Sequence, residues 1–433
     1  MGTTKFFFYL AICMIPFGRL ISEPIFQSAG KVVPLSFNDI ALGVLIFAYC
    51  IGCFIRRQPI FSRVPDYKLI LLFPMWCSIS LLLNMKHYGL SLGATLFSAL
   101  YLMRWVAYSF FYFVSYEIAA DRSTARKVTK WVFVGGLWFA LFGIAQAVFL
   151  PDFALQLHPE ALPFIDFDPQ GHRLVSTFLD PNIAAGFIVI LGLVAVSFSM
   201  HGFRRWIGPL FLFVGALAAT LSRGGFLGFV VGTLFLLIST PSLRTRLLKV
   251  SMATLVLLLA LYPLLRSQIE DKERFSLSDS SAMARLADWK LVSDVIIDRW
   301  ITGIGFNTFG LVSPEYGIVR EGALAFGFAG DLIVILALTG LIGLGIYLRM
   351  CRSMLASLAR LGNEADNRWD QAFGRGVGAA TLGVIASSFF TTLLLYPQIM
   401  AVLWILWALG KRLQNETDAR AQLINLKPVQ AAG

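Results

Sequence analysis

The sequence predicts an all-α membrane protein with about 12 transmembrane helices and one large outer loop between the ninth and tenth spans. Hydrophobic side chains make up 57% of the 433 residues, and charged side chains only 14%. A soluble domain carries roughly a quarter charged residues, so the composition argues against a soluble globular enzyme. The apolar residues also form runs bounded by charges, and basic residues gather in alternate loops between these runs.

The expected spans are apolar runs bounded by charges, close to the roughly 20 residues that cross a bilayer core of about 30 Å as a helix. The first run has Arg19 where a signal peptide would have a small-residue cleavage site, so we expect a retained span. The predicted spans are residues 5–21, 36–55, 68–84, 91–115, 131–150, 182–200, 206–221, 224–240, 250–265, 329–348, 375–394 and 396–410.

The distribution of Lys and Arg predicts the orientation, because positively charged loops stay in the cytoplasm. Basic residues cluster after spans 2, 4, 6, 8, 10 and 12, which makes these loops and both termini cytoplasmic. The acidic segment 151–181 and the polar segment 266–328 then lie outside the cytoplasm. The net charge of +11 is thus mostly a topology signal, and no nucleic-acid partner is expected.

The chain reads as one polytopic membrane domain, residues 1–433, that ends in a cytoplasmic tail at 411–433. The outer loop 266–328 contains an amphipathic helical pattern, which predicts a helix that caps the bundle or lies on the membrane surface. Its apolar face consists of Met283, Leu286, Trp289, Val292 and Ile296.

No motif indicates a metal or a nucleotide. The histidines have no metal-ligand spacing. The segment GIGFNTFG at Gly303–Gly310 lacks the preceding strand that a dinucleotide-binding loop requires. We therefore expect neither a bound metal nor a cofactor.

Four arginines lie at or near membrane depth, where a charge usually faces a partner or a cavity. Arg104 falls in mid-span and is expected to face the bundle interior in a structural, interhelical role. Arg173, Arg223 and Arg285 lie in outer segments and are expected to converge on one outward-facing cavity. The alternative for these three is snorkelling, or simple ion pairing with acidic residues of the outer loops.

The segment STFLDPNIAAGF predicts the outer start of a helix, with Asp180 as N-cap and Pro181 in the first turn. The N–H groups at such a start favour anions, so Asp180 and Asn182 are candidate binding residues beside Arg173. Ordinary capping is the alternative. His172 is a candidate for acid–base chemistry, or else a hydrated loop residue.

Four segments in order resemble the bacterial superfamily of O-antigen ligases and of O-antigen and exopolysaccharide polymerases, which are polytopic membrane glycosyltransferases. They are RLVSTFLDPNIAAGF (Arg173–Phe187), TLSRGGFLGFVVG (Thr220–Gly232), RLADWKLVSDVIIDRWITGIGFNTF (Arg285–Phe309) and DLIVILALTGLIGLGIYL (Asp331–Leu348). Each is weak alone, but their order and the twelve-span topology make the set fairly specific.

The resemblance implies transfer of a glycan from undecaprenyl diphosphate to an acceptor hydroxyl at the periplasmic face of the bacterial inner membrane, without a nucleotide sugar or an essential metal. It implies that Arg173, Arg223 and Arg285 stabilise charge on the leaving diphosphate, which suits the planar donors of arginine. A chain-length regulator and export proteins are candidate partners.

One departure from the family bears on the acceptor. Members generally have a histidine just before the tenth span, whereas this chain reads REGALAFGFAGDLIV there. Glu321 and Asp331 are the remaining candidates for the base that activates the acceptor hydroxyl. The missing histidine favours a polymerase, whose acceptor is another lipid-linked repeat unit, over a ligase, whose acceptor is the lipid A core.

A secondary transporter and a lipid-linked oligosaccharide flippase are the alternatives outside glycosyl transfer. The middle cytoplasmic loop is short, the largest polar segment is one outer loop, and the two halves show no matching broken spans. The candidate arginines also gather at one outer face. These features favour the enzyme.

Overall fold

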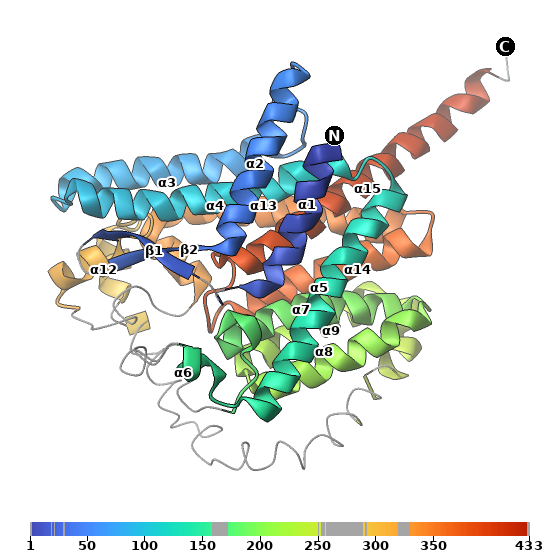
Figure 1. Ribbon diagram of the computed structural model, residues 1–433. Coiled ribbons are helices and arrows are strands. Elements are labelled where there is room, and N and C mark those ends of the chain that lie inside the picture. The colour runs from blue at the N-terminus through green and yellow to red at the C-terminus, as the bar shows by residue number, and fades with distance from the viewer. Residues whose placement is uncertain are drawn as a thin grey trace.

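The computed structural model describes residues 2–18, 20, 22–28, 31–157, 172–249, 251–252, 256, 289–290, 292–318 and 330–430. Helices form the bundle, and a short antiparallel hairpin, β1 (Ser22–Ser28) with β2 (Lys31–Ser36), lies beside it (Figure 1). The all-α membrane class predicted from the sequence is confirmed.

The helices begin and end as follows, with η for short 3-10 helices: α1 Gly2–Met14, η1 Ile15–Phe17, α2 Phe37–Ile55, α3 Tyr67–His87, α4 Leu92–Ile118, α5 Arg122–Phe149, α6 Phe153–Leu157, η3 Ser176–Phe178, α7 Pro181–Met200, η4 Arg204–Trp206, α8 Ile207–Thr220, α9 Arg223–Ser239, η5 Pro241–Leu243, α12 Phe309–Val312, η6 Ser313–Tyr316, α13 Asp331–Glu364, α14 Arg368–Ser387 and α15 Pro397–Gln430.

Within the described residues, 6 helices are long and apolar enough to cross a membrane: α2, α3, α4, α5, α7 and α13. A seventh span is possible if α9 counts together with Pro241–Lys249, to which it is joined by a bend of 105°. Two other predicted spans correspond to short helices, α1 with 13 residues and α8 with 14. The predicted span at 250–265 lies almost wholly outside the described residues.

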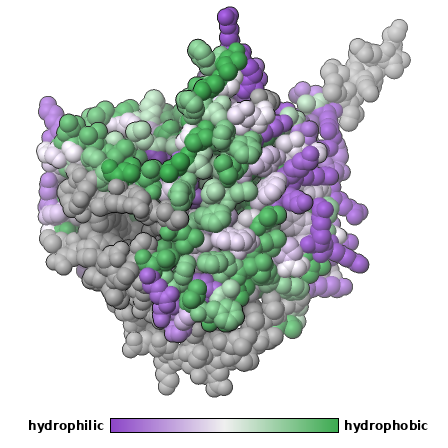
Figure 2. Space-filling view, viewed as in Figure 1, coloured by the Kyte–Doolittle hydropathy of each residue, from purple (hydrophilic) through white to green (hydrophobic). Residues whose placement is uncertain are grey.

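The bundle presents apolar side chains outward, as a surface in contact with lipid does. Phe47 and Phe54 on α2 are 67% and 85% exposed, and Val148 and Phe149 on α5 are 66% and 78% exposed. Figure 2 shows apolar residues over the middle of the visible face and hydrophilic ones most densely along the right edge, with others at the top, at the left edge and in the lower part. Lipid tails are as apolar as these side chains, so their exposure carries no cost in a bilayer.

Helix α7 lies at the centre of the bundle, with nearly all of its residues buried against α8, α9 and α14. A row of glycines, Gly224, Gly228 and Gly232, brings α9 close to α14. A Cβ atom at Gly228 would lie 2.4 Å from the carbonyl oxygen of Gly383 on α14. Small residues at four-residue spacing allow such close packing of membrane helices.

Ion pairs join the loops that the sequence assigns to the cytoplasm. Arg122 pairs with the fully buried Asp370 at 2.8 Å, between the starts of α5 and α14. Lys411 on α15 pairs with Asp66, just before α3, at 2.9 Å. Each of these two ion pairs therefore brings together two segments that the sequence assigns to the same side of the membrane.

Helix α13 is broken at Gly340, whose φ of 67° and ψ of −174° are not helical. The backbone N–H of Leu341 donates to the carbonyl of Trp300 at 2.7 Å. On the other side of the break, Ile304 and Gly305 donate to the carbonyls of Ala337 and Leu338 at 3.0 and 2.9 Å. The segment 300–305 thus supplies hydrogen-bond partners for the backbone groups of α13 that lose their helical partners at the break.

Side chains of α3 complete this junction. Ser80 donates to the carbonyl of Thr302 at 2.6 Å, and Asn84 donates to the carbonyl of Gly303 at 2.9 Å. Both side chains are nearly inaccessible to solvent. The GIG sequence at Gly303–Gly305 is therefore a packing element between α3 and α13, which explains its glycines without a nucleotide.

The variant Gly303→Ala is expected to destabilise the protein by about 3 kcal/mol or more, since a positive φ costs roughly 1 kcal/mol and overpacking adds roughly 1 to 3 kcal/mol. The new Cβ would lie 2.3 Å from the backbone carbon of Leu338. Gly317→Ala is the matched control, because Gly317 has the same φ of +69° and no described atom lies within 4 Å of its Cβ position. Unfolding of the detergent-solubilised variants measures the difference, and equal losses would contradict the close approach at Gly303.

Candidate functional site

The starts of α9 and α13 meet the end of α14 at one end of the bundle. The Ser387 hydroxyl donates to the carbonyl of Gly224 at 2.9 Å, which joins the end of α14 to the first turn of α9. The backbone N–H of Asp331 donates to the carbonyl of Ser388 at 2.9 Å, which joins the start of α13 to the same place.

The start of α7 belongs to the same group of helix ends. Ser222, the N-cap of α9, accepts a hydrogen bond from the backbone N–H of Gly225 at 3.3 Å. The hydroxyl of Ser222 also donates to the side-chain oxygen of Asn182 at 2.9 Å. Asn182 is in the first turn of α7, so this one hydroxyl holds two helix starts together. Each start carries the positive end of a helix dipole.

Asp180 caps α7, as the sequence predicts. Its carboxylate accepts hydrogen bonds from the backbone N–H groups of Asn182 at 2.7 Å and Ile183 at 3.1 Å. Pro181 occupies the first helical position, where a missing N–H costs nothing. The preceding residue Leu179 has a φ of 60°, which turns the chain sharply into the helix.

Arg173 lies beside the turn that joins α8 to α9. Its Nε donates to the carbonyl of Thr220, the last residue of α8, at 2.8 Å. A cation is favourable at the C-terminal end of a helix dipole. Since Thr220 stands three positions before Arg223, the structure brings these two predicted arginines into one region. Arg223 is solvent-exposed at the first position of α9.

The segment before α7 depends on Gln146 of α5, a residue that the sequence analysis missed. The side-chain oxygen of Gln146 accepts from the backbone N–H groups of Val175 and Ser176 at 3.0 and 3.1 Å. Its amide nitrogen donates to the carbonyl of Arg173 at 3.3 Å. A glutamine within a predicted span was the available signal, because a buried amide in an apolar helix needs partners.

Asp331 is completely buried at the start of α13. One of its carboxylate oxygens accepts from the backbone N–H groups of Leu393 and Leu394 at 2.6 and 2.7 Å. These bonds fix the loop between α14 and α15 against α13. The geometry is that of a carboxylate that holds backbone in place.

The outer segment approaches the start of α13 as well. A Cβ atom at Gly330 would lie 3.6 Å from the indole nitrogen of Trp289. Val292 and Val295, both completely buried, pack in one apolar cluster with Val334 of α13. The described part of the amphipathic segment therefore covers the bundle beside the candidate site.

The other residues singled out in the sequence lie outside this group of helix starts or outside the described residues. His172 is exposed and has a φ of 60°. Arg285 and Glu321 lie outside the described residues. Arg104 has the interhelical role expected of it, since it pairs with Asp39 at the start of α2 at 3.0 Å and donates to the carbonyl of Pro34. In the described part of the chain, no group of three or more His, Cys, Asp or Glu residues could hold a metal ion.

Residues 208–348 match the family described as O-antigen ligase. The match covers α8, α9, the described part of the outer segment and the first half of α13, and it includes Arg223 and Asp331. It confirms the superfamily expected from the motifs. Arg173, Asp180 and Asn182 precede the matched region. No curated protein matches the chain.

The variant Gln146→Ala is expected to loosen residues 172–178, because it leaves buried backbone N–H groups unsatisfied at roughly 1 to 3 kcal/mol each. Hydrogen exchange of this segment should accelerate about tenfold or more. The matched control is Gln398→Ala, which truncates another buried glutamine for which the described residues show no side-chain hydrogen bond. Unchanged exchange in the Gln146 variant would contradict its anchoring role.

Proposed function

We propose that the chain is a membrane glycosyltransferase that moves a glycan from a polyprenyl diphosphate to an acceptor hydroxyl. The observation that carries the proposal is the gathering of Arg173 and Arg223 beside the starts of α7 and α9. The O-antigen ligase match over residues 208–348 supports a glycosyltransferase of this superfamily.

The chemistry needs positive charge that is fixed before the reaction begins. When the glycosidic bond to the diphosphate breaks, negative charge builds on the leaving oxygen, and cations and aligned N–H groups stabilise it. Arg223, exposed on the first turn of α9, is proposed to contact the diphosphate. Arg173, held against Thr220, adds a second cation, and Arg285 of the outer loop a third.

Asp180 and Asn182 are proposed to shape the glycan side of this site. Asp180 fixes the first turn of α7, and Asn182 is oriented by Ser222. His172 lies next to Arg173 on the exposed side and is proposed to bind the glycan or the diphosphate.

The base that activates the acceptor is proposed to be Glu321. The carboxylate of Asp331 is buried and bound by two backbone N–H groups, which suits a residue that holds the loop at Leu393 and Leu394 more than it suits a general base. A base must reach the acceptor proton within hydrogen-bond distance. We propose that Asp331 is a positioning residue.

We propose a polymerase, whose acceptor is a second lipid-linked repeat unit, at the periplasmic face of the inner membrane. The absence of a histidine from residues 320–334 supports this choice over a ligase that uses the lipid A core. The donor is proposed to be undecaprenyl-diphosphate-linked, and no metal takes part in the proposed reaction. A chain-length regulator and export proteins are proposed partners.

Deletion of the gene should cause single lipid-linked repeat units to accumulate. The intact chain should restore long products, whereas Arg223→Ala should reduce polymerisation about a hundredfold, the usual cost of one lost donor to a developing anion. Arg205→Ala is the control, because Arg205 is an exposed arginine in a loop assigned to the opposite end. Mass spectrometry of the polyprenyl-diphosphate glycans gives the chain lengths.

Three other outcomes would contradict this proposal at different levels. Long lipid-linked polymers beside uncapped lipid A core would indicate a ligase. Repeat units trapped at the cytoplasmic face would indicate a flippase. Full activity of Arg223→Ala would remove this arginine from the site.

A further inference from the structure

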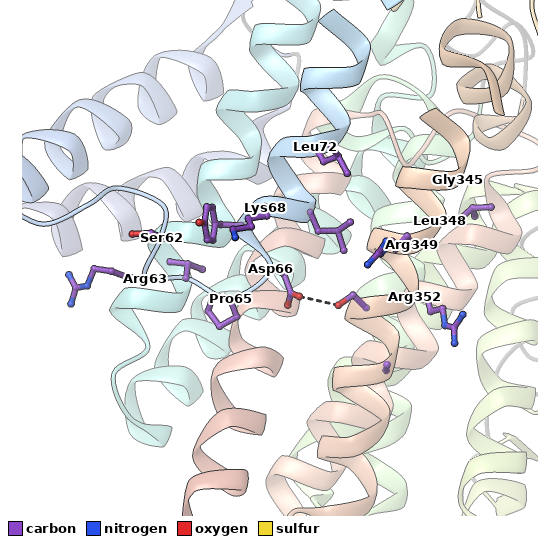
Figure 3. Close-up of a pocket in the computed structure, with 15 residues that line it drawn as sticks. Ser62, Arg63, Pro65, Asp66, Lys68, Leu72, Gly345, Leu348, Arg349 and Arg352 are labelled. Carbon is purple, nitrogen blue, oxygen red and sulfur yellow. Dashed lines mark hydrogen bonds between the residues drawn. The ribbon is translucent and has the colours of Figure 1, made fainter. Parts of the chain in front are cut away.

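A cavity lies at the basic end of the bundle, between the start of α3 and the middle of α13 (Figure 3). Its volume is about 1360 Å³. The residues that line it come from two segments, 62–69 with Leu72 on one side and 345–356 on the other. The sequence assigns both segments to the cytoplasmic end, away from the proposed active site.

The lining is strongly cationic. Arg63, Lys68, Arg349 and Arg352 line the cavity, and among the described lining residues Asp66 is the only acidic one. Arg63 also pairs with Glu117 at 3.8 Å. Figure 3 shows Arg349 on the side of α13 that faces α3, and Lys68 extending from the start of α3 on the side away from α13. Arg63 extends to the left of the view, and Arg352 lies to the right of α13.

Asp66 does not balance this charge, because its carboxylate is already engaged. Its Oδ2 pairs with Lys411 of α15 at 2.9 Å, and its Oδ1 accepts a hydrogen bond from Ser353 of α13 at 3.1 Å. For Lys68, Arg349 and Arg352, the described residues provide no carboxylate within ion-pair distance. The cavity therefore has a surplus of positive charge.

The positive charge of Lys68 is electrostatically unfavourable at the start of α3 unless an anion lies nearby. It lies in the first turn of α3, where the helix dipole has its positive end. Asp66 is the N-cap residue, but its side chain makes no capping hydrogen bond, since Lys411 and Ser353 occupy it. An anion in the cavity would neutralise the lysine and face the positive end of the helix.

The walls change from basic to apolar toward the membrane interior. On α3, Leu72 follows Lys68 by one turn. On α13, Leu348 precedes Arg352 by one turn. The two helices run in opposite directions here, so both leucines lie on the side of the membrane core and both cations toward its edge. A ligand that fits has an anionic head and an apolar tail.

We propose that this cavity is a binding site for one anionic phospholipid, with its headgroup attracted by the lining cations Lys68 and Arg349 and its acyl chains along Leu72 and Leu348. Basic pockets between helices at the cytoplasmic face suit such headgroups. Because Asp66 links α3, α13 and α15 at the same place, the bound lipid stabilises the contact between α3 and α13.

Native mass spectrometry of the delipidated full-length protein tests the site. Phosphatidylglycerol and phosphatidylcholine with identical acyl chains are the probes, and free glycerol phosphate is a third. The intact chain should prefer phosphatidylglycerol. The double variant Lys68→Gln with Arg349→Gln should bind it about tenfold more weakly or worse, since each cation contributes to the attraction.

The matched control is Arg205→Gln with Arg360→Gln, which removes two exposed arginines that do not line the cavity. It should bind phosphatidylglycerol as the intact chain does. Phosphatidylglycerol should also raise the unfolding temperature of the intact chain and of the control, but not that of the double variant.

Three results would overturn the proposal. They are equal affinity of the intact chain for the two lipids, equal loss of binding in both double variants, and displacement of the lipid by glycerol phosphate at comparable concentration. The last would indicate an anion site without lipid specificity. None of these results bears on glycosyl transfer, which is measured separately.

Discussion

A membrane helix can be broken only where other protein groups bind the backbone N–H and carbonyl groups that lose their helical partners, because lipid tails form no hydrogen bonds. The break of α13 at Gly340 meets this requirement through residues 300–305 and through Ser80 and Asn84 of α3. The same contacts anchor the segment that follows the long outer loop in the middle of the bundle. The outer segment from Trp289 onward, and with it the cover over the start of α13, depends on this junction.

The candidate site follows the same rule at the ends of helices. Gln146, Ser222 and Asp180 each bind backbone groups that would otherwise be buried without partners, and in doing so they fix the turns that carry Arg173 and Arg223. The arginines are therefore positioned by polar groups that take no part in the proposed chemistry. Fixed charge of this kind is what stabilisation of a leaving diphosphate requires.

Local signals in the sequence predicted much of this arrangement. Pro181 after Asp180 indicated a capped helix start, and the isolated Arg104 indicated an interhelical partner, which is Asp39. The break at Gly340 could not be predicted, since its partners are 35 or more residues away in the chain. The short helices α1 and α8 also look like spans in a hydropathy profile. Such a profile measures how apolar a segment is, but it does not show where the helix begins and ends. The fold class was thus predictable, whereas the number of spans and the hydrogen bonds of Asp331 with Leu393 and Leu394 depend on contacts between distant segments.

The most direct test of the central claim uses the purified protein in nanodiscs with a single labelled polyprenyl-diphosphate repeat unit as both donor and acceptor. We expect each new glycosidic bond to be accompanied by release of one polyprenyl diphosphate, with no added metal or nucleotide. Formation of dimers and longer products together with an equal amount of free polyprenyl diphosphate would support this expectation. Donor that remains intact under these conditions, in folded protein that binds it, would contradict glycosyl transfer by this chain.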